Sequence, residues 1–140
     1  MRKTRLLVAF LFLGVDWSAV AWGASQDWLA QVSGKERVRP NPIAHCEDQV
    51  AAGAILYRRN CASCHGHDAH GIGKRPALAT ERVHYASDGE LHWLLTNGQL
   101  GQGMPSWSRL PDIQRWQLVC YLHSLSHRDA AGQGVLVGPR

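Results

Sequence analysis

Two cysteines and a histidine near the middle of the chain have a spacing that suits covalent chemistry. Cys61, Ala62, Ser63, Cys64 and His65 form a C-x-x-C-H motif, the pattern of covalent haem attachment. Two thiols three positions apart at a helix end can both reach the vinyl groups on one edge of a porphyrin. The imidazole that follows is then held close to the iron, at a very high effective concentration. The motif therefore predicts haem c.

Two other readings of the cysteine pair are weaker. A thioredoxin-like redox site places its cysteine pair after a strand within a βαβ pattern, and no strand pattern precedes Cys61. A structural zinc site needs a second ligand pair at short spacing, whereas Cys46 and Cys120 are isolated and far apart. Haem attachment remains the favoured interpretation.

The segments around the motif have the patterns of helices. Residues 48–60 lead into Cys61 with an apolar stripe of helical period, and residues 111–125 carry a second such stripe. Between them, Ser87 and Glu90 have the spacing of a capping box, which starts a short helix that ends at Asn97 and Gly98. No segment shows a strand pattern. We therefore expect an all-α fold.

With these features, residues 48–125 resemble the class I c-type cytochromes. A glycine and an aromatic residue precede the haem motif in that family, as Gly53 and Tyr57 do here, so that the first helix crosses the last one closely. The resemblance implies a small cytochrome c fold, with three to five helices around one covalently bound haem. It also implies that the carbonyl of Pro76, in a Pro-x-Leu segment, accepts the Nδ1 proton of His65.

The sixth iron ligand is expected to be Met104, which follows Gly103 and precedes Pro105. The family ligates its iron from such a Gly-Met-Pro loop, and a thioether favours ferrous iron. Histidine is the rival ligand. His67 and His70 lie too near the attachment motif, and the remaining candidates are interpreted as solvated helix or loop residues: His84, His92, His123 and His127.

Other side chains are expected to contact the haem without ligating its iron. Trp107 and Trp93 are the aromatic residues closest to the ligand loop and the middle helix, and either indole N–H could reach a propionate. Arg75 precedes Pro76 and could pair with a propionate, with a solvated charge as the alternative.

The first residues read as an export signal. Residues 1–23 combine a basic start with a short apolar run, and cleavage is expected between Gly23 and Ala24. An uncleaved membrane anchor is the alternative, but Asp16 interrupts the apolar stretch. We expect a periplasmic protein without stable membrane insertion, with an N-terminal extension over residues 24–45, a cytochrome domain over 46–127 and a flexible tail over 128–140.

The charge balance gives no support to a nucleic-acid partner. The signal holds three of the 15 lysines and arginines and one of the 11 acidic residues, so the remaining chain is only weakly basic. It contains no basic cluster with interleaved aromatic residues.

With both axial positions filled by protein, the iron has no open coordination site, which favours an electron carrier over an enzyme. The expected partners are redox proteins: an exported dehydrogenase as donor, and an oxidase or another cytochrome as acceptor. A dedicated cytochrome subunit of a quinoprotein dehydrogenase or oxidase complex is the alternative. A five-coordinate haem enzyme or gas sensor, with a loosely held Met104, is the alternative of another class.

The two remaining cysteines, Cys46 and Cys120, could form a disulfide in an oxidising compartment. Cys120 lies off the apolar stripe of the last helix, so it should face the N-terminal extension, and Cys46 lies where that extension enters the first helix. The alternative is a buried thiol at Cys120 and a free surface thiol at Cys46.

Overall fold

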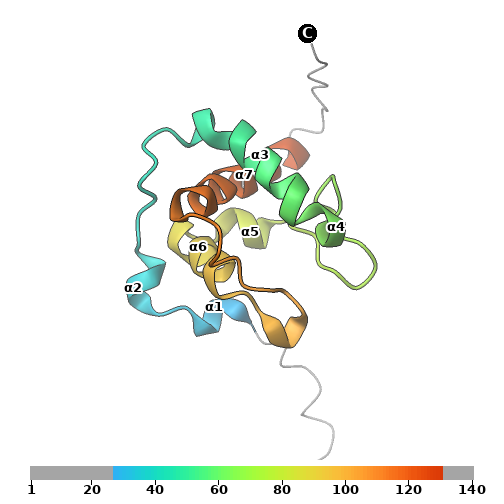
Figure 1. Cartoon of the computed structure of the whole chain (residues 1–140), viewed down its shortest axis with the longest axis horizontal. Coiled ribbons are helices and arrows are strands. Elements are labelled where there is room, and N and C mark those ends of the chain that lie inside the picture. Colours follow the sequence, from blue (N-terminus) through green and yellow to red (C-terminus); the bar gives the residue numbers. More distant parts are fainter. Residues whose placement is uncertain (1–26, 131–140) are drawn as a thin grey trace, which may run out of the picture.

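The computed structural model describes residues 27–130, and side chains as far as residue 125. The expected export signal over residues 1–23 and most of the expected tail lie outside this range. The described chain is helical (Figure 1) and contains two isolated bridges but no named strand, which confirms the all-α class. Its elements are α1 (Trp28–Gln31), α2 (Gly34–Arg37), η2 (Cys46–Gln49), α3 (Val50–Asn60), α4 (Ala62–His65), α5 (Glu81–Tyr85), α6 (Asp88–Asn97), η3 (Leu100–Gln102) and α7 (Asp112–Ala130).

The crossing of α3 over α7 is the central packing contact, and it depends on Gly53. A Cβ at this position would overlap the carbonyl oxygen of Gln117 and lie 2.7 Å from the Cβ of Tyr121. The helices can approach this closely because Gly53 has no side chain. One turn further along α3, the Tyr57 ring packs against the Tyr121 ring, with 5.1 Å between centroids. The crossing fixes the direction in which α3 delivers the haem motif.

The core lies where α3, α5, α6 and α7 meet. Its largest fully buried side chains come from three of these helices: Tyr57, Leu91, Trp116, Leu118 and Val119. Met104 and Trp107, from the loop between α6 and α7, are partly buried against the same cluster. The core therefore supports the loop that carries the expected methionine ligand.

The capping box is present as expected, since the Ser87 hydroxyl accepts from the Glu90 amide and the Glu90 carboxylate accepts from the Ser87 amide. The α6 helix ends at Asn97, and Gly98 follows with φ +68°. Two expected boundaries differ. The segment before Val50 is a 3₁₀ turn, η2, and α7 continues to Ala130, beyond residue 125 and into the expected tail. No glycine or proline interrupts the chain between Leu125 and Gly132, so nothing stops the helix earlier.

The N-terminal extension packs along α6 and α7 (Figure 1). It contains two one-turn helices, too short for a visible period, whose first turns are capped by Asp27 and Ser33. Arg37 forms an ion pair with Glu90 at 2.5 Å, and its carbonyl accepts a hydrogen bond from the Ser87 hydroxyl. The extension is therefore tied to the start of α6.

Candidate functional site

The C-x-x-C-H motif lies on a single helical turn at the end of α3. Cys61 directly follows α3 as its C-cap residue, and its carbonyl accepts hydrogen bonds from the amides of Cys64 and His65, at 3.0 and 2.9 Å. Both cysteines are free thiols, Cys61 partly buried and Cys64 exposed. Burial, with a smaller contribution from Cys64, raises the pKa of the Cys61 thiol to about 11. One turn therefore presents two free thiols and an imidazole.

The imidazole of His65 is oriented by the loop that follows. Its Nδ1 lies 2.8 Å from the carbonyl oxygen of Pro76, the contact that the family resemblance implies. Because a carbonyl can only accept, Nδ1 carries the proton and Nε2 keeps its lone pair. The Pro76 contact thus leaves His65 in the tautomer that ligates a metal through Nε2.

Backbone hydrogen bonds hold the loop over residues 66–79 in place. Gly66 ends α4 with φ +81°, and its carbonyl accepts from the Tyr57 hydroxyl at 2.7 Å. The Gly71 amide donates to the His65 carbonyl at 2.8 Å. Ala69 is buried, and its carbonyl accepts from Leu78 at 2.7 Å. These contacts fix the main chain that presents the Pro76 carbonyl.

Met104 lies in a tight loop between α6 and α7. Its backbone exchanges two hydrogen bonds with Gln99, at 2.8 and 3.1 Å. A Cβ on Gly98 would lie 2.5 Å from the carbonyl carbon of Pro105, so the two sides of the loop are in direct contact. The Trp107 amide then donates to the Leu95 carbonyl at 2.9 Å, which anchors the loop to α6. Met104 is therefore carried by a closed loop that is fixed at its base.

These residues fit haem c by the chemistry of their donors. Two free thiols at the attachment spacing share one turn with an imidazole whose Nε2 has a lone pair. A thioether, Met104, lies on a second loop that packs on the same core. Cys61, Cys64, His65 and Met104 would hold the group, and Trp107 is partly buried against the core.

Comparison with known proteins identifies the family of the chain. Residues 48–122, more than half of the chain, match the family described as cytochrome C oxidase, cbb3-type, subunit III. The chain belongs to this family. It is therefore a c-type cytochrome, and haem binding and electron transport follow as its general character.

Individual relatives are cbb3-type cytochrome c oxidase subunits. This cytochrome is 35% identical over 89 residues to subunit CcoP of Rhodobacter capsulatus, a match that covers 56% of this chain and 30% of the relative. It is 35% identical over 88 residues to CcoP of Azospirillum brasilense, with 56% and 30% covered. It is 39% identical over 81 residues to FixP of Bradyrhizobium sp. strain ORS 278, with 54% and 27% covered. The chain thus spans less than a third of these relatives.

Arg75 makes a contact in this cytochrome that the sequence did not indicate. Its side chain is exposed, and Nη1 donates to the carbonyls of Gln102 and Gly103, at 3.2 and 3.3 Å. The sequence predicts either a pair with a haem propionate or a solvated charge for this residue. Every residue has a main-chain carbonyl, so contacts to these groups leave no pattern of residue types in the sequence.

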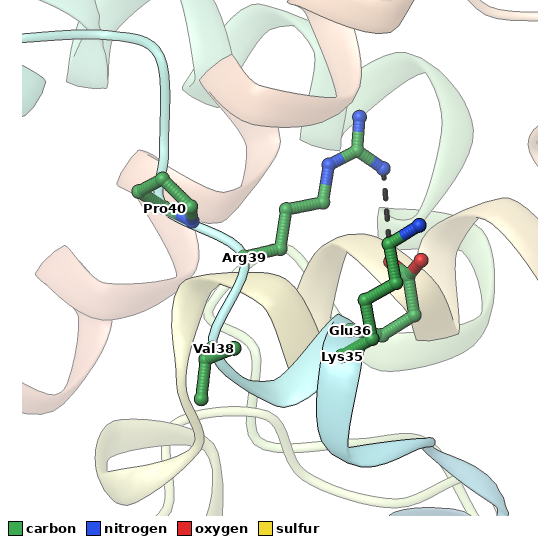
Figure 2. A pocket seen from close by; sticks show the side chains of 5 residues that line it. All are labelled: Lys35, Glu36, Val38, Arg39 and Pro40. Carbon is green, nitrogen blue, oxygen red and sulfur yellow. Dashed lines mark ion pairs between the residues drawn. The ribbon is translucent and has the colours of Figure 1, made fainter.

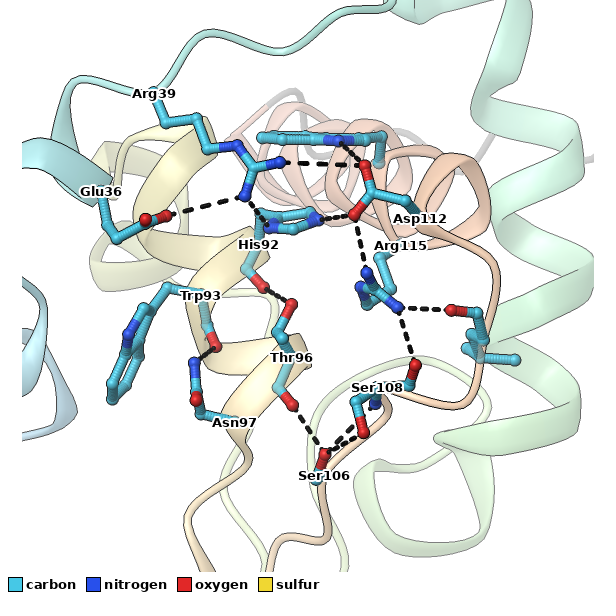
Figure 3. A network of polar contacts seen from close by, with 12 residues as sticks. Glu36, Arg39, His92, Trp93, Thr96, Asn97, Ser106, Ser108, Asp112 and Arg115 are labelled. Atoms are coloured by element: carbon cyan, nitrogen blue, oxygen red, sulfur yellow. Dashed lines mark hydrogen bonds and ion pairs between the residues drawn. The ribbon is translucent and has the colours of Figure 1, made fainter.

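The expectation that His92 is solvated is wrong. Its side chain is buried and stacks on the Trp116 ring, with 3.9 Å between centroids. Its Nε2 lies 3.0 Å from an Asp112 oxygen, and Arg39 Nη1 lies 3.5 Å from its Nδ1 (Figure 3). Burial lowers the pKa of His92, even though Asp112 favours its charged form. His92 is therefore a neutral side chain inside a polar network, away from the haem motif.

An open pocket of about 530 Å³ lies on the N-terminal extension (Figure 2). Two of its lining residues belong to α2, and α2 lies on the opposite side from α4 in the view of Figure 1. Its walls contain an ion pair between Arg39 and Glu36, and the lining residues are Lys35, Glu36, Val38, Arg39 and Pro40. The pocket is separate from the haem motif. Among residues 27–130, no helix combines the length and apolar character needed to cross a bilayer.

Proposed function

We propose that this cytochrome carries one haem c and passes single electrons to a terminal oxidase, as a dedicated subunit of the oxidase complex. The orientation of His65 by the Pro76 carbonyl is the observation that carries this proposal, because it prepares an axial ligand next to two attachment thiols. The relatives are named as oxidase subunits, which favours a subunit over a free shuttle between a dehydrogenase and an oxidase.

When bound, the haem supplies a one-electron couple at its iron. His65 and Met104 would both ligate the iron, which would leave no coordination position for substrate, so the domain would act as a carrier rather than an enzyme. The hydrogen bond to Pro76 holds the His65 ring and increases its donor strength. The loop around Met104 presents a weak, soft thioether ligand, which raises the reduction potential.

Haem content and ligation are tested on the full chain, expressed with export and haem-attachment machinery. Mass spectrometry should find one haem per chain, bonded through thioethers to Cys61 and Cys64. The oxidised protein should show the long-wavelength charge-transfer band of a sulfur–iron bond. Met104→Ala should lose that band, lower the reduction potential and bind carbon monoxide. Leu100→Ala, at a 77% exposed position in the same loop, is the matched control and should behave as wild type.

The partner is tested with purified cbb3-type oxidase. Reduced cytochrome should be oxidised by the enzyme with uptake of oxygen. Comigration with the oxidase through purification identifies a subunit, whereas turnover without comigration identifies an exported shuttle and contradicts the subunit assignment. If the reduced cytochrome does not transfer electrons to the oxidase, the oxidase is not its partner.

The proposed location is the periplasm, with the signal removed before Ala24. N-terminal sequencing of the exported protein should begin at Ala24. A protein that keeps residues 1–23 and remains in the membrane fraction would contradict cleavage and support an anchor.

A further inference from the structure

We infer that Arg75 is a positioning residue that ties the loop orienting His65 to the loop carrying Met104. The inference rests on the proposed axial ligation by these two residues. Arg75 precedes Pro76, whose carbonyl holds the His65 ring. Its guanidinium donates to the carbonyls of Gln102 and Gly103, the two residues before Met104. One side chain thus bridges two segments 27 and 28 residues apart.

The main chain of Arg75 is fixed to the His65 side. Its amide donates to the Ile72 carbonyl at 3.0 Å, and its carbonyl oxygen packs directly on Gly71. A Cβ on Gly71 would overlap that oxygen and lie 3.0 Å from the carbonyl carbon of Pro76. The Gly71 amide in turn donates to the His65 carbonyl at 2.8 Å. Arg75 is therefore anchored to the segment that orients the imidazole.

The guanidinium of Arg75 is fitted to the Met104 side in the same way. Gly103 has φ +79°, and a Cβ there would lie 2.6 Å from Nη1 of Arg75. The absence of a side chain at Gly103 allows the guanidinium to reach the two carbonyls. A rigid, planar group with several donors suits this shared contact better than a flexible ammonium. The loop carrying Met104 thereby gains an anchor in addition to its base at Gln99.

The bridge from the Arg75 guanidinium to the carbonyls of Gln102 and Gly103, called the clamp from here on, depends on hydrogen-bond donors. A pair between Arg75 and a haem propionate would depend on charge. Arg75→Met keeps the length of the side chain but removes donors and charge. Arg75→Gln removes the charge and keeps an amide donor. Lys74→Met removes a neighbouring exposed charge from the same loop and serves as the charge control.

The experiment measures imidazole binding to the oxidised haem protein, since imidazole competes with Met104 for the iron. Loss of two exposed hydrogen bonds from a charged donor should make Arg75→Met bind imidazole about tenfold more tightly than wild type. Arg75→Gln should bind about threefold more tightly, and Lys74→Met should match wild type. The sulfur–iron band of Arg75→Met should disappear at lower denaturant than its far-ultraviolet circular dichroism, because the clamp holds a loop and not the helices.

Gly103→Ala tests the clamp from the other side while the charge of Arg75 is kept. It should also tighten imidazole binding, and its effect should be much smaller in the Arg75→Met background, because the two changes disrupt one contact. Gly73→Ala controls for backbone strain, since Gly73 has φ +59° and nothing within 4 Å of a Cβ. Gly73→Ala should leave imidazole binding unchanged.

The outcomes separate the clamp from the proposed function. A wild-type protein without the sulfur–iron band overturns both. A wild-type band together with unchanged imidazole binding in Arg75→Met overturns the clamp alone. Equal effects of Arg75→Gln and Arg75→Met, or additive effects of Arg75→Met and Gly103→Ala, assign Arg75 to a charge or separate role and also overturn the clamp.

Discussion

His92 is a buried side chain that connects three parts of the structure, a role that its residue type does not predict. Its Nε2–H donates to Asp112, and its Nδ1 accepts from Arg39, so both ring nitrogens have partners while the ring is neutral (Figure 3). Asp112 also accepts from the Trp116 indole at 2.9 Å and from Arg115 at 2.6 Å. The arrangement joins the extension, α6 and α7 through one imidazole.

The pKa directions in this network predict a loss of stability in acid. Burial lowers the pKa of His92 in the folded chain below 6.5. As pH falls, the His92 imidazole is therefore protonated in the unfolded chain before it is protonated in the folded chain. The free energy of unfolding consequently decreases as pH falls below about 6.5. For Asp112, burial opposes the shift, but hydrogen bonds from Trp116 and His92 lower its pKa below 3.8. The contribution of Asp112 to the free energy of unfolding is therefore also lost as pH falls, but at lower pH than that of His92.

The measurement is the free energy of unfolding of the haem protein in denaturant between pH 7.5 and about 5. Wild type should become less stable across this range, and His92→Gln should have a flatter pH dependence. The exposed His45→Gln serves as control and should keep the wild-type slope. An unchanged slope in His92→Gln would remove His92 as the source of the acid sensitivity.

At the scale of elements, the sequence predicted the helices whose ends carry strong local signals. The Ser87 and Glu90 box and the Gly98 end of α6 appear as expected, because capping is decided by neighbouring residues. The one-turn helices of the extension were missed, since four residues cannot show a period. The Arg75 contacts were missed because they join main-chain groups of a distant loop, which no local pattern encodes.

The crossing of α3 over α7 gives a test of element packing. In Gly53→Ala, the new Cβ would overlap Gln117 and press on Tyr121. We expect destabilisation by about 1–3 kcal/mol, since the helices must separate. Gly34→Ala, in α2 with nothing within 4 Å, should be neutral or slightly stabilising. Equal stability of Gly53→Ala and wild type in thermal unfolding would show that α3 and α7 can accommodate a methyl group at their crossing.

At the scale of the whole molecule, a covalent link joins η2, directly after the N-terminal extension, to the last helix. Cys46 and Cys120 form a disulfide with a Cα separation of 5.2 Å, within the usual range. The Asn41 side-chain amide lies 3.6 and 3.5 Å from the two sulfur atoms. The extension thus covers the α7 face that points away from the Leu118 and Tyr121 stripe, as the position of Cys120 suggested.

Removal of the disulfide should lower stability with little effect on the haem spectrum. The link closes a loop across a sequence separation of 74, and chain entropy sets an upper bound of about 4 kcal/mol for its contribution. The haem already restrains the chain, so Cys46→Ser with Cys120→Ser should cost less than this bound. Alkylation of denatured protein followed by mass spectrometry should label two thiols only after reduction. Labelling without a reductant would show that the protein lacks the bridge.

The folding of the whole domain should depend on the haem. The loops carrying Pro76 and Met104 are held mainly by backbone hydrogen bonds and glycine turns, and they contain little helix of their own. A haem attached at Cys61 and Cys64 and ligated by Met104 would connect both loops to α3, and it adds apolar contacts that a short chain needs.

The triple variant with alanine at Cys61, Cys64 and His65, which cannot attach haem, should therefore be largely unfolded even with the Cys46 to Cys120 disulfide intact. Its far-ultraviolet circular dichroism should show reduced helicity and no cooperative melting. The loss should be greater than in Met104→Ala, which keeps the attached haem and the His65 bond. Native-like helicity and a cooperative transition in the triple variant would mean that the crossing of α3 over α7 and the disulfide suffice to fold the domain, and that haem binds to a preformed structure.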